Sequence, residues 1–268
     1  RDVQLPRRIV LAPASPLAPD PIRSSALTLR IEPIAQAQTP SGGPNFAAPA
    51  VVGGRLHVVD QAGGRILRDD GMGGFSEILS PAQMPAGVTP VREGVLNMAG
   101  GAGSDVFVTF TSSTLPDDAP EARRLPDVPI YRPGSPYYHL VYRYSQASDG
   151  SLGDPEPLAA FESRSSGHTG GGMLGLPDGN LLLATGDNLG FDRDGLVAPQ
   201  DPASHLGKLL LIDAQTGQTT VAAQGVRNVQ RLAYADPGRS RVIFADIGST
   251  TAEEINEISV GDLTDTAR

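Results

Sequence analysis

Cysteine is absent from this chain of 268 residues. Its absence excludes catalysis by a thiol, disulfide bonds and metal sites built from thiolates. Lysine is scarce as well, because Lys208 is the only one. No apolar run approaches the length of a membrane-spanning helix, and residues 1–6 contain no apolar core of an export signal. We therefore expect a soluble protein without a membrane span, from which any export signal has been removed or was never present.

Positive charge is low overall and is never clustered. The formal net charge is -9, and no segment of the chain is strongly basic. Proteins that bind nucleic acid or an anionic membrane surface concentrate lysine and arginine in a patch. We therefore expect neither nucleic acid nor a membrane surface as a partner.

Glycine and proline, in contrast, are abundant, with 32 and 24 residues spread along the whole chain. This composition favours many short strands joined by tight turns over long helices. Short apolar strands recur in units of about forty to fifty residues, which is the size of a propeller blade. They lie at residues 51–59, 65–68, 106–110, 140–144, 173–176, 180–184, 208–212, 230–234 and 241–245. The sequence predicts an all-β propeller with about four recognisable blades.

The first 44 residues differ from the rest of the chain. Several prolines between residues 13 and 33 exclude a long helix, so we expect an extended strap and linker with one strand at residues 27–32. Residues 45–268 form the predicted propeller domain. Within it, the proline-rich residues 112–137 predict a long surface loop over one face, and residues 251–258 predict one short helical turn.

The motif HTGGG (168–172) places a histidine directly before a run of glycines, and PDG (177–179) then presets a tight turn. Glycine lets the backbone approach another group closely, and loops at strand ends often carry catalytic residues. His168 is therefore a candidate catalytic residue, and a surface or core histidine without a function is the alternative. The run is also similar to the oxyanion-hole loop of a lipase, but the chain has no GxSxG motif to supply the nucleophile.

Other polar clusters have a functional and a structural interpretation. Arg227 and Asn228 follow a glycine and precede an apolar strand, so they could direct a cation and an amide at a ligand oxygen. An exposed arginine in a turn is the alternative. The acidic residues 187–195 could bind calcium, but they do not have the register of an EF-hand. The glutamates at 253, 254 and 257 could form a metal site. Solvated surface is the interpretation favoured for both groups.

A series of motifs follows in a fixed order between residues 45 and 260. They are the strand pair 55–68, GVLNMA (94–99), strands 138–144 and 152–158, the stretch 168–187, LGKLL (206–210) after QD (200–201), GVRNVQRLA (225–233) and the turn 246–258. In this order they resemble the pyrroloquinoline-quinone-dependent soluble glucose and aldose sugar dehydrogenases, also called glucose/sorbosone dehydrogenases. The stretch 168–187 is the most specific match.

The resemblance implies a six-bladed propeller that binds pyrroloquinoline quinone on its top face and oxidises the C1 hydroxyl of an aldose. In that scheme His168 takes the proton of the anomeric hydroxyl while a hydride passes from sugar C1 to quinone C5. Arg227 lies at the quinone carbonyl that gains negative charge, and Asn228 lies beside it. Arg92 stands where the family has a glutamine that contacts the quinone.

The resemblance also implies calcium. One Ca²⁺ polarises the quinone through carbonyls that match Gly248 and Ser249, which makes Gly248 part of the cofactor site, and a separate structural Ca²⁺ uses Glu254. The implied partners are a small sugar substrate and an electron acceptor. The implied location is the periplasm or the outside of the cell.

Some positions depart from the family pattern. Gly167 replaces the aspartate that usually precedes the histidine and orients it, and Ile247 replaces a glutamine or histidine in the calcium turn. The family's chains continue through further blades, whose lysine and arginines hold the quinone carboxylates. This sequence stops at Arg268, so we expect either that the remaining blades are absent from this chain or that the N-terminal segment replaces part of them. Without those blades, another chain or segment would cover the open propeller edges.

These departures support an alternative hypothesis, a non-catalytic propeller that serves as a binding module. The two hypotheses differ in whether cationic side chains of this chain reach the centre of the propeller. The candidates in the proline-rich excursion are Arg123, Arg124 and Arg132.

Overall fold

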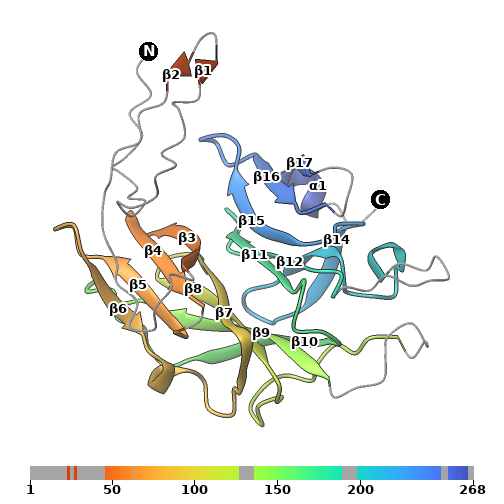
Figure 1. The fold of residues 1–268 in the computed structure, drawn as a ribbon, viewed down its shortest axis with the longest axis horizontal. Coiled ribbons are helices and arrows are strands. Elements are labelled where there is room, and N and C mark those ends of the chain that lie inside the picture. Colours follow the sequence, from red (N-terminus) through yellow and green to blue (C-terminus); the bar gives the residue numbers. More distant parts are fainter. Residues whose placement is uncertain are drawn as a thin grey trace.

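The structure is a computed structural model, and it describes residues 23–24, 27–28, 46–61, 63–126, 136–188, 198–248 and 253–264. Antiparallel strands dominate this part of the chain (Figure 1). The predicted strap and linker lies outside it, except for β1 (Arg23–Ser24) and β2 (Leu27–Thr28), which pair with each other. The strand predicted for residues 27–32 is therefore described only in its first two residues.

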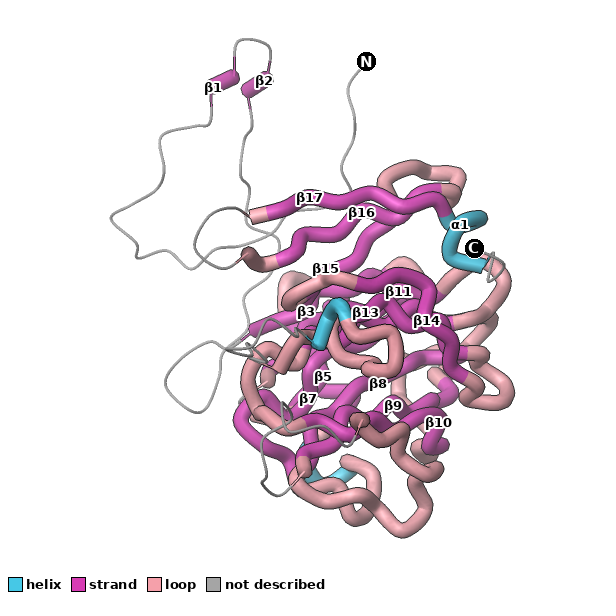
Figure 2. The backbone as a smooth tube through the Cα atoms, turned by 90° about the vertical axis from the view of Figure 1, so that its right-hand side faces the viewer, coloured by secondary structure: helices cyan, strands magenta, loops and turns pink. Residues whose placement is uncertain are grey.

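Four antiparallel meanders, which we call blades 1 to 4, follow one another along the chain (Figure 1), and Figure 2 shows blade 4 at one end of the series. Blade 1 contains β3 (Phe46–Val52), β4 (Arg55–Asp60), β5 (Arg65–Asp69) and β6 (Phe75–Leu79); blade 2 contains β7 (Pro90–Gly100), β8 (Asp105–Ser112), β9 (Tyr137–Ser145) and β10 (Glu156–Ser163); blade 3 contains β11 (Gly170–Gly175), β12 (Leu181–Thr185), β13 (Lys208–Ile212) and β14 (Thr219–Gln224); blade 4 contains β15 (Val229–Tyr234), β16 (Arg241–Asp246) and β17 (Glu254–Ser259). This arrangement confirms the predicted all-β propeller.

The first strands of the blades, β3, β7, β11 and β15, lie next to one another in this order. They run in one direction, because Gly100 lies beside Val52 and Gly175 near the strand ends, whereas Asn228 contacts Gly170 near the strand starts. A Cβ on Gly175 would lie 1.9 Å from the carbonyl oxygen of Gly100, so only glycine permits this approach. The glycine-rich run therefore packs the inner strands together, and their starts gather on one face of the propeller.

The hydrophobic core lies between neighbouring blades. Blades 1 and 2 meet around Phe110 and Tyr142, whose rings pack edge to face with centroids 5.8 Å apart. Phe107 and Phe161 belong to the cluster between blades 2 and 3, and Phe244 belongs to that between blades 3 and 4. Because each blade is held to the next by buried side chains, the loops that precede the inner strands keep fixed relative positions.

The proline-rich excursion of blade 2 covers a sheet edge. Arg123 N–H donates to the carbonyl of Ala160 at 2.9 Å, and Glu162 N–H donates to the carbonyl of Arg123 at 3.0 Å. Arg123 thus forms a parallel bridge with Phe161 on β10, the outer strand of the blade. The sequence predicted a loop over one face, but the described part of the excursion runs along the edge. It satisfies backbone groups that would otherwise be open to pairing with another chain.

The helices of the described residues are short: η1 (Pro81–Gln83), η2 (Ala198–Gln200) and α1 (Val260–Thr264). In this part of the chain, no helix combines the length and the apolar character that crossing a membrane requires. The helical turn predicted for residues 251–258 is wrong where it is described, because β17 pairs with β16 along its whole length. The three-residue spacing of Ile255 and Ile258 suits a helix, but the pairing with β16 overrides this local preference.

Candidate active site

His168 lies in the loop that leads into β11, on the face where the inner strands start. Its backbone has φ 51°, in the left-handed region that residues other than glycine rarely adopt. Asn188 N–H donates to the carbonyl of His168 at 3.2 Å. Gly186 makes room for this contact, because a Cβ there would lie 1.8 Å from the same carbonyl oxygen. Backbone strain of this kind is concentrated at functional sites.

A buried carboxylate orients the imidazole of His168. His168 Nδ1 lies 2.9 Å from Asp187 Oδ1, and the two side chains are 23% and 2% exposed. A carboxylate only accepts hydrogen bonds, so Nδ1 carries the proton and Nε2 presents its lone pair. Among the described residues, Nε2 has no hydrogen-bond partner. This geometry suits a general base, which needs a fixed tautomer and an open nitrogen.

The orienting carboxylate is Asp187, which the sequence analysis considered only as part of a possible calcium site. That analysis expected it immediately before the histidine, where Gly167 stands, and therefore treated it as missing. In the structure Asp187 follows β12, which pairs antiparallel with β11 and matches Gly170 with Thr185. The pairing returns the chain to His168 after nineteen residues. The Gly-Asp pair at the end of an apolar strand was the available signal.

Arg227 approaches the other oxygen of the same carboxylate. Arg227 Nε lies 3.7 Å from Asp187 Oδ2. The loop that carries Arg227 is fixed by Asp246 at the end of β16, whose two oxygens accept the backbone N–H groups of Arg227 at 2.8 Å and of Asn228 at 2.7 Å. Asp187 thus stands between a base and a cation. The sequence analysis missed the clamp by Asp246, which lies eighteen and nineteen residues from its partners.

Two amide side chains hold the glycine run from neighbouring blades. Asn228 Oδ1 accepts the N–H of Gly170 at 3.1 Å, and Asn97 of β7 donates from Nδ2 to the carbonyl of Gly171 at 2.8 Å. Both amides are buried. Asn228, which the sequence analysis placed in the cofactor site, therefore anchors the histidine loop to blade 4.

Lys208, the only lysine, supports the turn after β12 through the segment that precedes β13. Lys208 is fully buried at the start of β13, and its Nζ donates to the carbonyls of Pro199 and Leu206 at 2.9 Å each. Burial lowers the pKa of Lys208 to about 8. The segment held in this way continues to Gly207, whose N–H donates to the carbonyl of Gly186 at 3.0 Å. Lys208 therefore supports the turn that carries Asp187.

One of the two carbonyls expected to bind calcium, that of Gly248, contacts a cation already. Arg227 Nη1 donates to the carbonyls of Ile247 and Gly248 at 2.8 Å each, and Gly248 N–H donates to Glu253 Oε2 at 2.9 Å. Ser249 lies outside the described residues. Glu254 is exposed, and its Oε2 accepts from Asn256. No group of three or more His, Cys, Asp or Glu residues suited to a metal occurs among the described residues. With their present contacts, the Gly248 carbonyl and the Glu254 carboxylate do not fit the Ca²⁺ ligand roles expected of them.

Comparison with solved structures identifies the architecture. The PQQ-bound form of aldose sugar dehydrogenase from Streptomyces coelicolor superposes with a TM-score of 0.58 at 22% identity, covering 84% of this chain and 62% of that one. A putative oxidoreductase (glucose dehydrogenase) from Thermus thermophilus gives 0.54 at 19% identity, covering 80% and 62%. The chain has the propeller fold of these sugar dehydrogenases. It spans less than two thirds of their length. No protein-family model matches the chain, and no curated protein matches its sequence.

Two polar side chains of the site are accessible to a ligand. The side chains of His168 and Arg227 are 23% and 22% exposed, so both are accessible beside Asp187. A guanidinium there can donate to a quinone carbonyl while the imidazole faces a hydroxyl.

The arginines considered for the carboxylates of the quinone lie elsewhere or are not described. Arg123 and Arg124 lie on the outer side of blade 2, where Arg124 lines a cavity of about 460 Å³ with Glu162 and Arg164. Arg132 is outside the described residues, as is the side chain of Arg92 on β7. In the described part of the chain, the excursion therefore brings no cation to the propeller centre.

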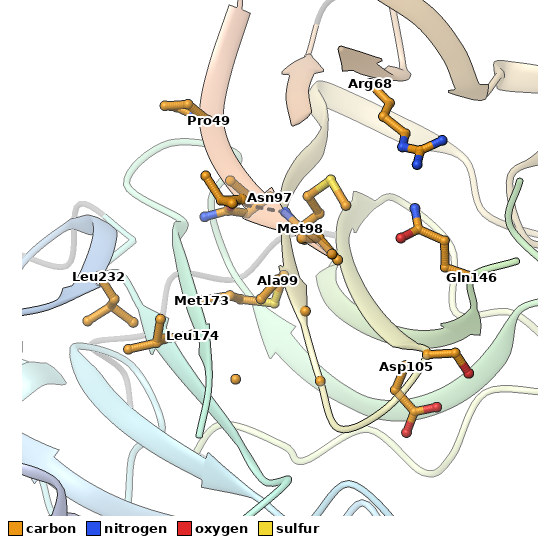
Figure 3. A pocket seen from close by; sticks show the side chains of 18 of the residues that line it. Pro49, Arg68, Asn97, Met98, Ala99, Asp105, Gln146, Met173, Leu174 and Leu232 are labelled. Atoms are coloured by element: carbon orange, nitrogen blue, oxygen red, sulfur yellow. Dashed lines mark hydrogen bonds between the residues drawn. The ribbon is translucent and has the colours of Figure 1, made fainter. Parts of the chain in front are cut away.

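A cavity of about 660 Å³ lies near the ends of the inner strands. Figure 3 shows Arg68 and Gln146 pointing toward each other on one side of the cavity, with Met98 on β7 and Met173 on β11. Arg68, Met98 and Met173 lie toward the ends of their strands, and Gln146 directly follows β9, whereas His168 precedes β11. We place the candidate active site at His168, because a base, a carboxylate and a cation meet there.

The strained backbone of His168 yields a stability prediction. Replacing His168 by glycine relieves the left-handed conformation, whereas replacing it by alanine keeps the strain. We expect the His168→Gly variant to be more stable than His168→Ala by about 1 kcal/mol, and both to lack the base. Urea denaturation of the two variants measures this difference. Equal stability, or a more stable alanine variant, would show that the residue is not strained.

Proposed function

We propose that this chain is a quinoprotein oxidoreductase, or a part of one, that oxidises the C1 hydroxyl of an aldose with pyrroloquinoline quinone as the hydride acceptor. The observation that carries the proposal is the arrangement of His168, Asp187 and Arg227 on the face where the inner strands start. Asp187 contacts the other two residues through its two oxygens, at 2.9 and 3.7 Å. The likeness of fold to the PQQ-bound aldose sugar dehydrogenase supports it.

The side chains have separate roles in this reaction. His168 Nε2 takes the proton of the C1 hydroxyl while C1 loses its hydrogen as hydride, so that a hemiacetal becomes a lactone. Asp187 keeps the tautomer of His168 fixed and stabilises the imidazolium that forms. Arg227 directs positive charge at the carbonyl oxygen of the hydride acceptor, which gains negative charge. Pyrroloquinoline quinone, when bound, supplies the two-electron acceptor. An electron acceptor then has to reoxidise it, and the proposed location is the periplasm or the outside of the cell.

The test is a titration of the protein with pyrroloquinoline quinone, followed by addition of aldoses. We expect saturable binding and a loss of quinone absorbance that depends on the sugar. A His168→Gln variant, which keeps a polar side chain of similar size, should bind the quinone but reduce it at most slowly. Unchanged reduction by this variant would refute the role of His168, and absence of quinone binding would refute the proposed function.

The second candidate is a non-catalytic propeller used for binding. The position of Arg123 and Arg124 at the edge of blade 2 favours it, because they do not supply the clamp that a tricarboxylate needs. The same titration separates the two functions. A folded protein that binds no quinone would favour the binding module. A chain that covers the open propeller edges would be one partner of such a module.

A further inference from the structure

One guanidinium nitrogen holds two carbonyls that follow β16, those of Ile247 and Gly248. Arg227 Nη1 lies 2.8 Å from the carbonyl oxygens of Ile247 and Gly248. A guanidinium NH₂ group has two hydrogens, and each carbonyl receives one of them. The two carbonyl dipoles thus converge on a positive charge that belongs to the protein.

This arrangement is fixed from several sides. The backbone N–H of Arg227 is held by Asp246 at 2.8 Å, and its Nε lies 3.7 Å from Asp187. The acceptor side is fixed as well, because Gly248 N–H donates to Glu253 Oε2 at 2.9 Å. Both the guanidinium and the carbonyl pair are therefore positioned before any ligand arrives.

Calcium needs a different environment from the one found here. Ca²⁺ takes six to eight oxygen ligands and prefers carboxylates among them. At these carbonyls it would meet the charge of Arg227, and the carboxylate of Glu253 is bound to the backbone of the same turn. Glu254 is exposed on β17 and contacts Asn256. The carbonyl oxygens that could coordinate a metal instead accept charge-assisted hydrogen bonds from the guanidinium.

We propose that Arg227 occupies the role that the resemblance gives to Ca²⁺, so that the site binds a quinone or carboxylate oxygen through a guanidinium and without a divalent cation. For the quinone itself this inference rests on the proposed function. It concerns the chain's own carbonyl pair, however, and can be tested without any reaction.

The first experiment measures the affinity for pyrroloquinoline quinone in excess EDTA and in millimolar CaCl₂. We expect the same dissociation constant in both, and a loss of about tenfold or more when Arg227 is replaced by methionine. The control variant is Arg231→Met, because Arg231 lies on β15 and its Nη1 donates to the adjacent carbonyl of Gln230. Binding that requires CaCl₂ would overturn the inference and leave the proposed function standing.

The second experiment uses CaCl₂ alone and decides the inference even if no quinone binds. Thermal unfolding of the wild type, Arg227→Met and Arg231→Met is compared with and without CaCl₂. We expect the midpoint to rise with CaCl₂ more in Arg227→Met than in the other two, because its carbonyl pair has been released. The comparison cancels any Ca²⁺ effect at other acidic loops. An equal response of all three proteins, or a larger response of the wild type, would overturn the inference.

Discussion

Replacing Asp187 by asparagine is expected to lower aldose oxidation by about 100- to 10 000-fold. The carboxylate accepts a hydrogen bond from His168 Nδ1 at 2.9 Å and is buried. An asparagine amide in the same place can donate instead, which favours the tautomer with the proton on Nε2 and removes the lone pair that acts as the base. The imidazolium that forms during the reaction would also lose its counter-charge.

The measurement is the steady-state rate against pH for the wild type and Asp187→Asn. The loss should appear in turnover more than in quinone affinity, because Asp187 is covered and acts through His168. Asp178→Asn is the control, since Asp178 lies in the exposed turn before β12 and caps Asn180. A variant with normal turnover, or a control with an equal loss, would remove Asp187 from the proposed mechanism.

Mild acid is expected to unfold the protein. His57, His139 and His205 are buried, and burial lowers the pKa of each to about 4 from the ordinary value of 6.5. Below pH 6.5 the unfolded chain binds more protons than the folded one, so the free energy of unfolding falls as the pH drops from 6.5 to 4. Each histidine costs about 3 kcal/mol by pH 4, against a total stability of about 5–15 kcal/mol for a typical domain.

Urea denaturation between pH 7 and pH 4.5 tests this expectation. The slope of the unfolding free energy against pH gives the number of protons that the unfolded chain binds in excess of the folded one. We expect this number to approach three at the acidic end of the range. A His57→Gln variant should reduce the uptake by one proton, because it removes one of the three buried histidines. The substitution disturbs few hydrogen bonds, since among the described residues the ring nitrogens of His57 bond to Gln146 and the carbonyl of Arg55. A stability that is constant over this range would contradict the expectation.

The fold class follows from local patterns in the sequence. Short apolar strands, tight turns and the recurrence of similar units reflect interactions between residues near one another in the chain, so they can be recognised without coordinates. The excursion and residues 251–258 were less predictable. Arg123 bridges to Phe161, and β17 pairs with β16, so distant or competing strand pairing decided their conformations.

His168 could be selected from the sequence because its glycine-rich surroundings are local. Its chemical setting could not, because it depends on strand register and on loops from different blades. Antiparallel pairing of β11 with β12 brings Asp187 to the imidazole, and packing of blade 3 against blade 4 brings Arg227 to the same carboxylate. Only these tertiary contacts decided that Gly248 faces a guanidinium, because the side chain of Arg227 had to reach carbonyls twenty and twenty-one residues farther along the chain.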